Sequence, residues 1–464
     1  MTQNPIRYYV VCDADQGLKP GYFDKNTQIA DQWARRYVAD HVYGRPIAEP
    51  PFKIRARPSA QVSSGSERPD AFDKMQELVV ALDVVGDDTH SSEQVVDHII
   101  AAVRQKPEIF IGSSPDLVFA SADHWCIGDA TDPIFSDRSV AERVLAVDFL
   151  RQQPNASGTH VNVVIVDQGL DRQALGGSYG GGWSVGDSQP GSAPQLPDSV
   201  QRPHAMMIAE NILKVAPNAK LFDLPLVPPR IANIQAFLSL ADAAFRQMLN
   251  DIDFWRLGPF PGPWILVNPW GIYDRRSEHP LGHYTENPHN PFNKLVKHAV
   301  AQRIDVVFAA GNCGQFCPDN RCGEKARGPG RSIWGANSLE EVLTVGAVRA
   351  DDMWLGYSSQ GPGQQLLGRN KPDICAASQF CEDDDAFTIN TGTSAACGLA
   401  AGVVAALRSR WSDATVSPHQ LKQILNQTAR RPVAVPWSNS LKHRLGHGVL
   451  DARAAFQALS AQYH

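Results

Sequence analysis

Asp167, His204 and Ser394 are residues of the three types that together perform nucleophilic catalysis. A serine hydroxyl is a poor nucleophile near neutral pH, so it needs an adjacent base, and the base needs a third group that orients it. A hydroxyl, an imidazole and a carboxylate can fill these three roles. Along this chain they come in the order Asp, His, Ser, which is one of the few orders in which such a triad recurs. The residues therefore predict acyl transfer through a serine.

The surroundings of the three residues suit these roles. Asp167 ends the apolar run 161–167, which predicts a buried central strand where a carboxylate is fixed and partly desolvated. His204 opens a helical pattern, and Ser394 comes just before the helix predicted over 395–410. The N–H groups of a helix N-terminus stabilise negative charge that develops on a substrate carbonyl. Ser394 is therefore placed as a nucleophile would be.

Asn312 adds a fourth group to this set. It follows the apolar strand predicted over 305–310, and there its side-chain amide could donate a hydrogen bond to an oxyanion.

The elements that must hold these groups alternate between strands and helices. Such alternation indicates an α/β fold with a mostly parallel central sheet flanked by helices. Further strands are predicted over 264–267 and 342–348, and helices over 140–150, 204–215, 231–248 and 291–303. The Gly-rich stretch 176–193 predicts a flexible surface loop.

The segments around these four residues resemble motifs of the subtilisin-like serine protease (subtilase) family. The resemblance runs from about Pro133 to the C-terminus, and the motifs follow the family's order. The main motifs are 163–171 around the aspartate, Ala309-Ala310-Gly311-Asn312, and Gly392-Thr393-Ser394-Ala395-Ala396; supporting segments are 215–221, 357–362, 371–374 and 446–452. The resemblance implies a subtilisin-like fold.

The resemblance also implies a role for each candidate residue. Ser394 would be the nucleophile, His204 the general base and then acid, and Asp167 its orienter. Asn312 and the Ser394 N–H would form the oxyanion hole. The implied function is that of a serine endopeptidase, which hydrolyses peptide bonds of protein or peptide substrates through an acyl-enzyme on Ser394.

Substrate-binding residues are implied in the same way. The strand at 265–271 corresponds to the one on which a peptide is laid antiparallel, an arrangement that draws affinity from main-chain hydrogen bonds. The residues expected to contact substrate are Pro269, Trp270 and Gly271 on this strand and Ala309, Ala310 and Gly311 in the wall of the primary specificity pocket.

Three departures from the family pattern put efficiency and specificity in doubt. Ala205, Met206 and Met207 replace the Gly, Thr and His that usually follow the catalytic histidine; Pro269-Trp270 replaces Ser-Leu; Gly398-Leu399 replaces Pro-His. None of them deletes a catalytic group. Two alternatives stay open: a peptide-binding relative that has lost turnover, and a dedicated processing protease with one partner substrate.

The N-terminal part, residues 1–133, predicts a small α/β domain ahead of the peptidase domain at 134–464. Strands are expected over 7–12 and 109–120, helical patterns over 29–42, 73–82 and 92–103, and a loop over 46–69. This domain is either a propeptide that is removed or a retained domain that docks substrate or a regulatory partner.

Composition narrows the range of partners and compartments. The chain of 464 residues carries a net charge of −6, which gives no basic field for nucleic acid or acidic membranes. It contains no stretch near the roughly 20 apolar residues of a membrane span, and no secretory signal is recognised. These features favour a cytoplasmic location, although an already trimmed chain or export by another route would look the same.

No cofactor is expected to be required, but two clusters could bind metal. Cys313, Cys317 and Cys322 could hold zinc, yet their spacing lacks the paired C-x-x-C pattern, so a disulfide or free thiols is the preferred interpretation. Without a signal peptide the default state of the thiols is reduced. The run 382–385 could bind calcium, although such a charge run is more often a solvated loop, so no calcium site is assigned.

Overall fold

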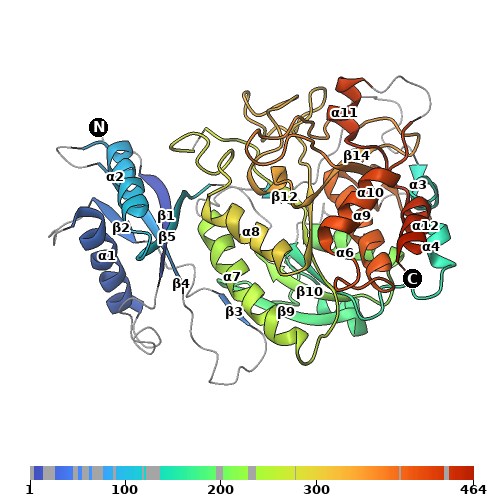
Figure 1. The fold of residues 1–464 in the computed structure, drawn as a ribbon, viewed down its shortest axis with the longest axis horizontal. Coiled ribbons are helices and arrows are strands. Elements are labelled where there is room, and N and C mark those ends of the chain that lie inside the picture. Colours follow the sequence, from blue (N-terminus) through green and yellow to red (C-terminus); the bar gives the residue numbers. More distant parts are fainter. Residues whose placement is uncertain are drawn as a thin grey trace.

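The computed structural model describes residues 5–13, 27–44, 51–54, 62–64, 77–86, 90–117, 120–121, 136–194, 202–227, 237–276, 278–385, 388–432 and 438–463. They form a small N-terminal body and a larger body, which lie side by side in Figure 1. The expected boundary near residue 133 stays a prediction.

An eight-stranded sheet forms the centre of the larger body, in the order β15-β14-β13-β11-β8-β10-β9-β3. All neighbours pair in parallel except β3, which lies antiparallel at one edge. The strands are β3 (Val62–Ser64), β8 (Asn162–Asp167), β9 (Tyr179–Val185), β10 (Lys220–Pro225), β11 (Trp264–Asn268), β13 (Ile304–Ala309), β14 (Leu343–Val348) and β15 (Ile374–Ala377). The predicted α/β architecture with a mostly parallel sheet is confirmed.

Helices cover both faces of this sheet because its central strands are buried on both sides. Alternate residues of β8 enter different cores: Val163 and Ile165 enter one, and Val164 and Val166 the other. The first core is covered by α3 (Arg138–Val144), α4 (Val147–Arg151), α6 (His204–Val215), α9 (Gly392–Arg408), α10 (Pro418–Thr428) and α12 (Ala452–Gln462). The second is covered by α7 (Phe237–Arg256) and α8 (Pro291–Ala301).

Helices α6 and α9, which carry His204 and Ser394, pack closely against each other. A Cβ atom added to Gly398 would lie 3.0 Å from the Cβ of Asn211, and one added to Gly402 would lie 2.9 Å from the Cβ of Val215. Glycine at these positions therefore lets the two helices approach each other closely.

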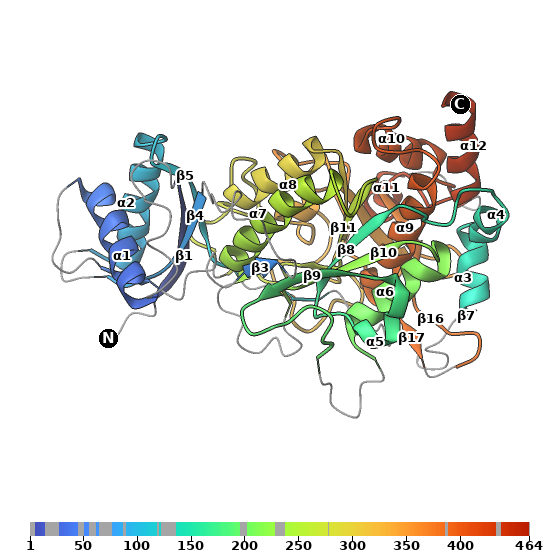
Figure 2. The same ribbon diagram turned by 90° about the horizontal axis from the view of Figure 1, so that it is seen from below.

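The N-terminal body is an antiparallel sheet, β2-β4-β1-β5, with helices α1 and α2 on one face. Its other face packs against α7 and α8 of the larger body, as Figure 2 shows from below. The elements are β1 (Ile6–Asp13), α1 (Thr27–Tyr43), β2 (Phe52–Ile54), β4 (Glu77–Val84), α2 (Ser92–Gln105) and β5 (Phe110–Pro115). Alternation along β1 again separates the cores: Tyr8 and Val10 face α1 and α2, whereas Tyr9 and Val11 face the larger body.

Three sequence expectations about the N-terminal part and its neighbours are wrong. The segment 73–82, expected as an amphipathic helix, is strand β4 from Glu77 onward, because it lies between β2 and β1 and is buried on both faces; residues 73–76 lie outside the described residues. The expected loop 46–69 contains β2 and β3 in its described parts. The helix expected over 140–150 is divided into α3 and α4, because Ala146 adopts a left-handed conformation at φ 56°.

The Gly-rich segment 176–193 is also not simply a surface loop. It contains β9, which pairs with β10. A Cβ on Gly182 would lie 2.3 Å from the carbonyl oxygen of Asp223, so glycine is needed for the close approach of these two strands.

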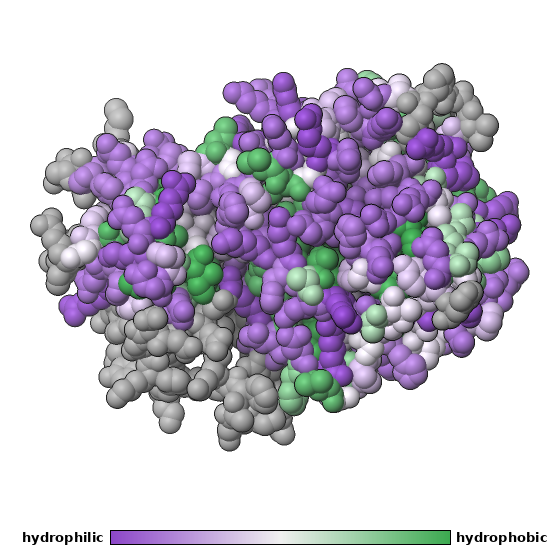
Figure 3. All heavy atoms as spheres, viewed as in Figure 1, coloured by the Kyte–Doolittle hydropathy of each residue, from purple (hydrophilic) through white to green (hydrophobic). Residues whose placement is uncertain are grey.

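The surface has no large continuous apolar region on the face drawn in Figure 3, where hydrophobic residues lie in small separate patches. Within the described ranges, none of the helices combines the length and apolarity that crossing a bilayer requires.

Candidate active site

Asp167 and His204 are in direct contact. Asp167 is the last residue of β8, fully buried between β11 and β10, and His204 is the first residue of α6. Their contact joins Asp167 Oδ2 and His204 Nδ1 at 2.5 Å. The backbone N–H of His204 donates to the side-chain oxygen of Gln168, so the start of α6 is tied to the end of the strand. The ring is thus fixed through its Nδ1 edge, as an orienting carboxylate would fix a base.

The altered residues after His204 have packing roles. Ala205 is completely buried, and the sulfur of Met206 accepts a hydrogen bond from the Asp171 N–H at 3.3 Å. The Met206 contact therefore ties α6 to the segment that follows β8, and the imidazole keeps its contact with Asp167.

A second buried carboxylate, Asp223, braces the same junction from β10. Its Oδ2 accepts hydrogen bonds from the N–H groups of Leu170 at 2.9 Å and Gly191 at 2.8 Å. Burial raises the pKa of Asp223 to about 7, and the two N–H donors only partly offset this rise. Asp223 therefore holds the loop next to Asp167 and changes its charge near neutral pH.

Asn312 lies two residues beyond Ala310 in the segment that follows β13, and its amide has a fixed orientation. Its Oδ1 accepts hydrogen bonds from the N–H of Thr393 at 3.0 Å and from the Thr393 hydroxyl at 2.9 Å. The Nδ2 group is buried and has no hydrogen-bond partner among the described residues. A buried donor without a partner is costly, so such a group suggests that a ligand completes it. The amide is therefore anchored through its oxygen to Thr393, the residue that precedes Ser394.

Ser394 is the third residue of α9 and is fully buried. Its Oγ donates a hydrogen bond to the carbonyl oxygen of Pro269 at 3.2 Å. The hydroxyl is therefore directed at the strand that the sequence predicts as the substrate strand.

This strand is already paired with another part of the chain. Strand β12 (Trp270–Gly271) pairs antiparallel with β6 (Ala120–Ser121), which follows the N-terminal body. Pairing of this kind is the arrangement expected for a bound peptide.

The Trp270 side chain packs among other aromatic rings in the core. It is fully buried and makes edge-to-face contacts with Phe237 and Phe308, each at 5.3 Å between ring centroids. Only the backbone of Trp270 is therefore placed to contact a substrate.

The expected wall of the specificity pocket is tied to this strand by Asn337, a residue that no sequence signal marked. Its Nδ2 donates to the carbonyl oxygens of Trp270 at 2.8 Å and Ala309 at 2.9 Å. Ala310 follows Ala309, and Gly311 donates its N–H to the Thr393 hydroxyl at 3.1 Å. The positioning roles of Asn337 and Thr393 depend on contacts between segments that are far apart in the sequence, so no local pattern indicates them.

A disulfide closes the loop that follows the proposed oxyanion donor. Cys313 and Cys322 are bonded, with their Cα atoms 5.7 Å apart, and Cys317 is free. The expectation of reduced thiols is therefore wrong for this pair, which also excludes both sulfurs as zinc ligands. Inside the loop, the N–H of Asp319 donates to the carbonyl oxygen of Asn312 at 2.9 Å.

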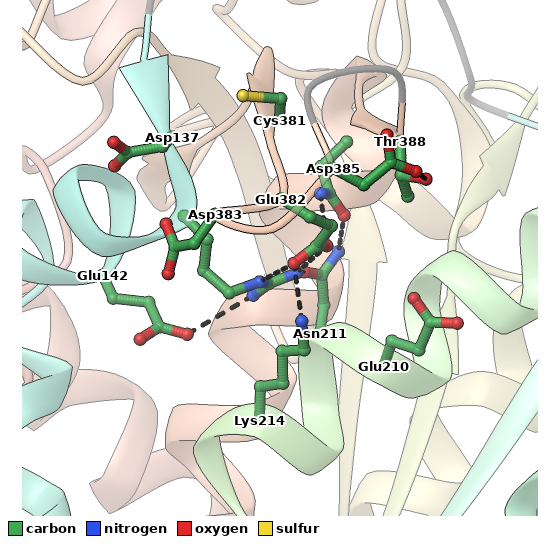
Figure 4. Close-up of polar contacts among 12 residues, drawn as sticks. Asp137, Glu142, Glu210, Asn211, Lys214, Cys381, Glu382, Asp383, Asp385 and Thr388 are labelled. Carbon is green, nitrogen blue, oxygen red and sulfur yellow. Dashed lines mark hydrogen bonds and ion pairs between the residues drawn. The ribbon is translucent and has the colours of Figure 1, made fainter.

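The acidic run 382–385 is not simply a solvated loop, because its first residue is buried. Glu382 accepts hydrogen bonds from Arg138 at 2.6 and 2.7 Å and from Lys214 at 2.6 Å (Figure 4). Burial alone would raise the pKa of Glu382, but these cations outweigh it and hold the pKa well below its ordinary range. No group of three potential metal ligands occurs among the described residues, so calcium remains unassigned.

The structure shows three contacts that involve candidate residues. Asp167 touches His204, and Asn312 is bonded to Thr393, which precedes Ser394. Ser394 itself is bonded to Pro269 of the expected substrate strand.

Comparison with solved structures finds a likeness to fervidolysin from Fervidobacterium pennivorans, described as a keratinolytic enzyme related to subtilisin. The identity is 14%, the TM-score is 0.55, and the match covers 98% of this chain and 61% of fervidolysin. This chain therefore spans less than two thirds of that protein, and the likeness concerns the fold. MycP1 from Mycobacterium smegmatis matches at 19% identity over 74% of this chain and 90% of its own, with a TM-score of 0.45. A search of curated proteins finds no match.

The model of the subtilase family matches residues 209–448, just over half of the chain. The matched range contains Asn312 and Ser394 and begins five residues after His204. With the subtilisin-like sheet and its flanking helices, this match identifies the chain as a member of the subtilase family of serine proteases.

Proposed function

We propose that this chain is a serine endopeptidase with Ser394 as nucleophile, His204 as base, Asp167 as its orienter and Asn312 as an oxyanion donor. The observation that carries the proposal is the fixed amide of Asn312. Its oxygen is held by Thr393, so its buried NH₂ group is left to donate beside the N-terminus of α9, where Ser394 lies. A donor whose orientation is fixed in this way can stabilise a negative charge that forms only during the reaction.

The reaction follows from these positions. Ser394 Oγ attacks the peptide carbonyl carbon while His204 takes its proton, and the carbonyl oxygen becomes an oxyanion held by Asn312 Nδ2 and the Ser394 N–H. Collapse breaks the C–N bond as His204 gives its proton to the leaving amine. Water then attacks the acyl ester, His204 takes a proton from it, and Ser394 leaves with that proton. Asp167 stays ionised throughout and stabilises the imidazolium.

The hydrogen bond from Ser394 to Pro269 suggests how substrate binding prepares the nucleophile. A peptide that pairs with this strand brings a main-chain N–H to the Pro269 carbonyl oxygen. This oxygen is better placed to accept a hydrogen bond from that N–H than from the Ser394 hydroxyl. The hydroxyl is then released to His204. Pro269 lacks an N–H, but this step needs only its carbonyl oxygen.

Strand β6 is proposed to act as an intramolecular occupant of the substrate strand. It pairs with β12 in the antiparallel direction, and Asp116 just before it is bonded to Ser239 of α7. The N-terminal body therefore serves as a docking domain whose displacement opens the site. The intact mass of the expressed chain will show whether the N-terminal body is removed or retained.

The test is covalent labelling of the full-length chain with a fluorophosphonate, with the modified residue located by peptide mass spectrometry. We expect Ser394 to be labelled, and the label to be lost in His204→Ala, because a phosphonate reports an activated serine. The matched control is Ser409→Ala, a serine at the other end of α9 whose hydroxyl bonds the Asn155 and Ala406 carbonyls.

Two outcomes would separate the alternatives. A wild-type chain that binds peptides but is neither labelled nor able to cleave any protein would favour a binding relative and contradict the proposal. Labelling of Ser394 together with cleavage of one protein only, in a peptide-library and protein panel, would identify a dedicated processing protease.

A further inference from the structure

A buried polar cluster joins the segments that carry the proposed base and nucleophile. It combines three cations, one carboxylate and two amides from the start of α3, from α6 and the segment just before it, and from the hairpin before α9. Its members, called the Arg138 cluster below, are Arg138, Arg202, Asn211, Lys214, Glu382 and Asn390.

The centre of the cluster is a two-bond ion pair between Arg138 and Glu382. Arg138 Nε donates to Glu382 Oε2 at 2.6 Å, and Nη2 donates to Oε1 at 2.7 Å. The side chains are 5% and 6% exposed, so the pair is screened from water. Arg138 Nη2 also donates to Asn211 Oδ1 at 2.7 Å, and Lys214 donates to Glu382 from the same helix (Figure 4). Such a fork is strong and directional.

Asn390 is the residue through which the cluster reaches the nucleophile. It ends β17 (Ile389–Asn390), is fully buried and lies four residues before Ser394. Its Nδ2 donates to Glu382 at 2.8 Å, while its Oδ1 accepts from Asn211 at 3.1 Å and from Arg202 at 2.9 Å. Three side chains therefore fix the amide of Asn390, and with it the entry to α9.

The same residues reach the base. Arg202 lies two residues before His204 and also donates to the Ile389 carbonyl at 3.2 Å. Asn211 lies on α6 seven residues after His204, about two turns along the same face. Asn390 is therefore contacted by one residue that precedes His204 in the sequence and by one that follows it.

We infer that the Arg138 cluster sets the spacing between His204 and Ser394, and that Arg138 and Glu382 are positioning residues for the proposed reaction. The residues act through Asn390 and α6 and do not touch substrate. Misplacement of reacting groups by about 1 Å can cost on the order of 100-fold in rate. Loosening the cluster is therefore expected to lower kcat and leave KM almost unchanged. This inference rests on the proposed function.

The test compares Arg138→Lys with Arg408→Lys in the full-length chain. Lysine keeps the charge at both positions but cannot form the fork. Arg408 makes an equivalent buried pair with Asp305, at 2.6 and 2.7 Å, but lies at the far end of α9. Both variants should lose thermal stability to a similar degree. Only Arg138→Lys should lower kcat and the rate of fluorophosphonate labelling, by roughly 10- to 100-fold.

A milder variant keeps the inference testable if Arg138→Lys does not fold. The Lys214 side chain is 42% exposed, so Lys214→Gln should be tolerated and should lower kcat by about two- to fivefold. A folded Arg138→Lys variant with the kcat of the wild type would overturn the inference. If Arg138→Lys does not fold, a Lys214→Gln variant with the wild-type kcat would do the same. Equal losses of kcat in Arg138→Lys and Arg408→Lys would also overturn it. In these cases the wild type is labelled and active, so the proposed function stands. A wild type that is neither labelled nor active would overturn both.

Discussion

The amide of Asn312 is held by Thr393 through two hydrogen bonds, one from the backbone N–H at 3.0 Å and one from the hydroxyl at 2.9 Å. Because a backbone N–H can only donate, Oδ1 of Asn312 must face Thr393, and the NH₂ group must face away from it. Thr393 precedes the proposed nucleophile, so one residue aligns the oxyanion donor with Ser394.

Asn312→Ala should lower kcat by roughly 10²–10³ with little change in KM, because the lost hydrogen bond forms only with the oxyanion. Thr393→Val keeps the backbone donor and the side-chain shape but loses the hydroxyl, so a smaller loss of kcat is expected. Steady-state kinetics on a peptide substrate measure both. An effect of Asn312→Ala confined to KM would instead place this amide in ground-state binding.

The Cys313–Cys322 disulfide should stabilise the loop behind Asn312. It closes a short loop with a sequence separation of 9. Loop-closure entropy therefore predicts a loss of about 2–3 kcal/mol in the free energy of unfolding for the Cys313→Ser, Cys322→Ser double variant. Chemical denaturation measures this loss, and Cys317→Ser is the matched control. Equal unfolding curves for the double variant and the oxidised wild type would show that the bond does not contribute to stability.

Asp223 should make stability depend on pH. Its pKa is raised by burial from 3.8 to about 7, so between these values the native state binds more protons than the unfolded state. The stabilising contribution is therefore fully present below about pH 4 and is lost as the pH rises through 7. Asp223→Asn keeps an acceptor for Leu170 and Gly191 but cannot ionise.

The difference in the free energy of unfolding, wild type minus Asp223→Asn, should consequently be smaller at pH 8 than at pH 4. Denaturant titrations at both pH values measure it. The control is Asp148→Asn, at an exposed position on α4. A wild-type-minus-variant difference that does not change with pH for Asp223→Asn would contradict a raised pKa.

Asp116→Ala should loosen the N-terminal body. The carboxylate accepts hydrogen bonds from the N–H and hydroxyl of Ser239, in the first turn of α7, at 3.0 and 2.6 Å. Loss of such a cap costs about 1 kcal/mol, or roughly a fivefold change in an opening equilibrium. If β6 blocks the site, the rate of fluorophosphonate labelling should rise by that factor. A labelling rate equal to wild type, in a variant whose docking is shown by hydrogen exchange to be weaker, would contradict the blocking role of β6.

Much of the fold could be predicted because local patterns agree with the tertiary environment. The apolar run that forms β8 is buried on both faces, and helix α6 begins at His204 as its pattern indicates. The strand β4 was mistaken for a helix because a central strand buried on both faces shows no alternation. Strand β9 was missed because its glycines fit a neighbouring strand rather than a turn.

The site could be predicted only in part. Asp167, His204, Asn312 and Ser394 stand in motif contexts, so the sequence alone was enough to predict them as site residues, and their roles stay predictions. Asn337 and the Arg138 cluster were not found, because their roles depend on partners far apart in the sequence: Arg138 and Glu382 are 244 positions apart. Hydrogen bonds between such residues have no local pattern.

The measurement that tests the central claim most directly is cleavage of a protein substrate by wild type, Ser394→Ala and Ser409→Ala, with intact-mass analysis of both the enzyme and the substrate. Wild type and Ser409→Ala should produce new termini in the substrate at the same rate. Ser394→Ala should be slower on the order of 10⁶-fold, by analogy with loss of the nucleophile in subtilisin, while keeping the wild-type unfolding curve. Cleavage by Ser394→Ala at the wild-type rate would contradict the assignment of Ser394 as nucleophile.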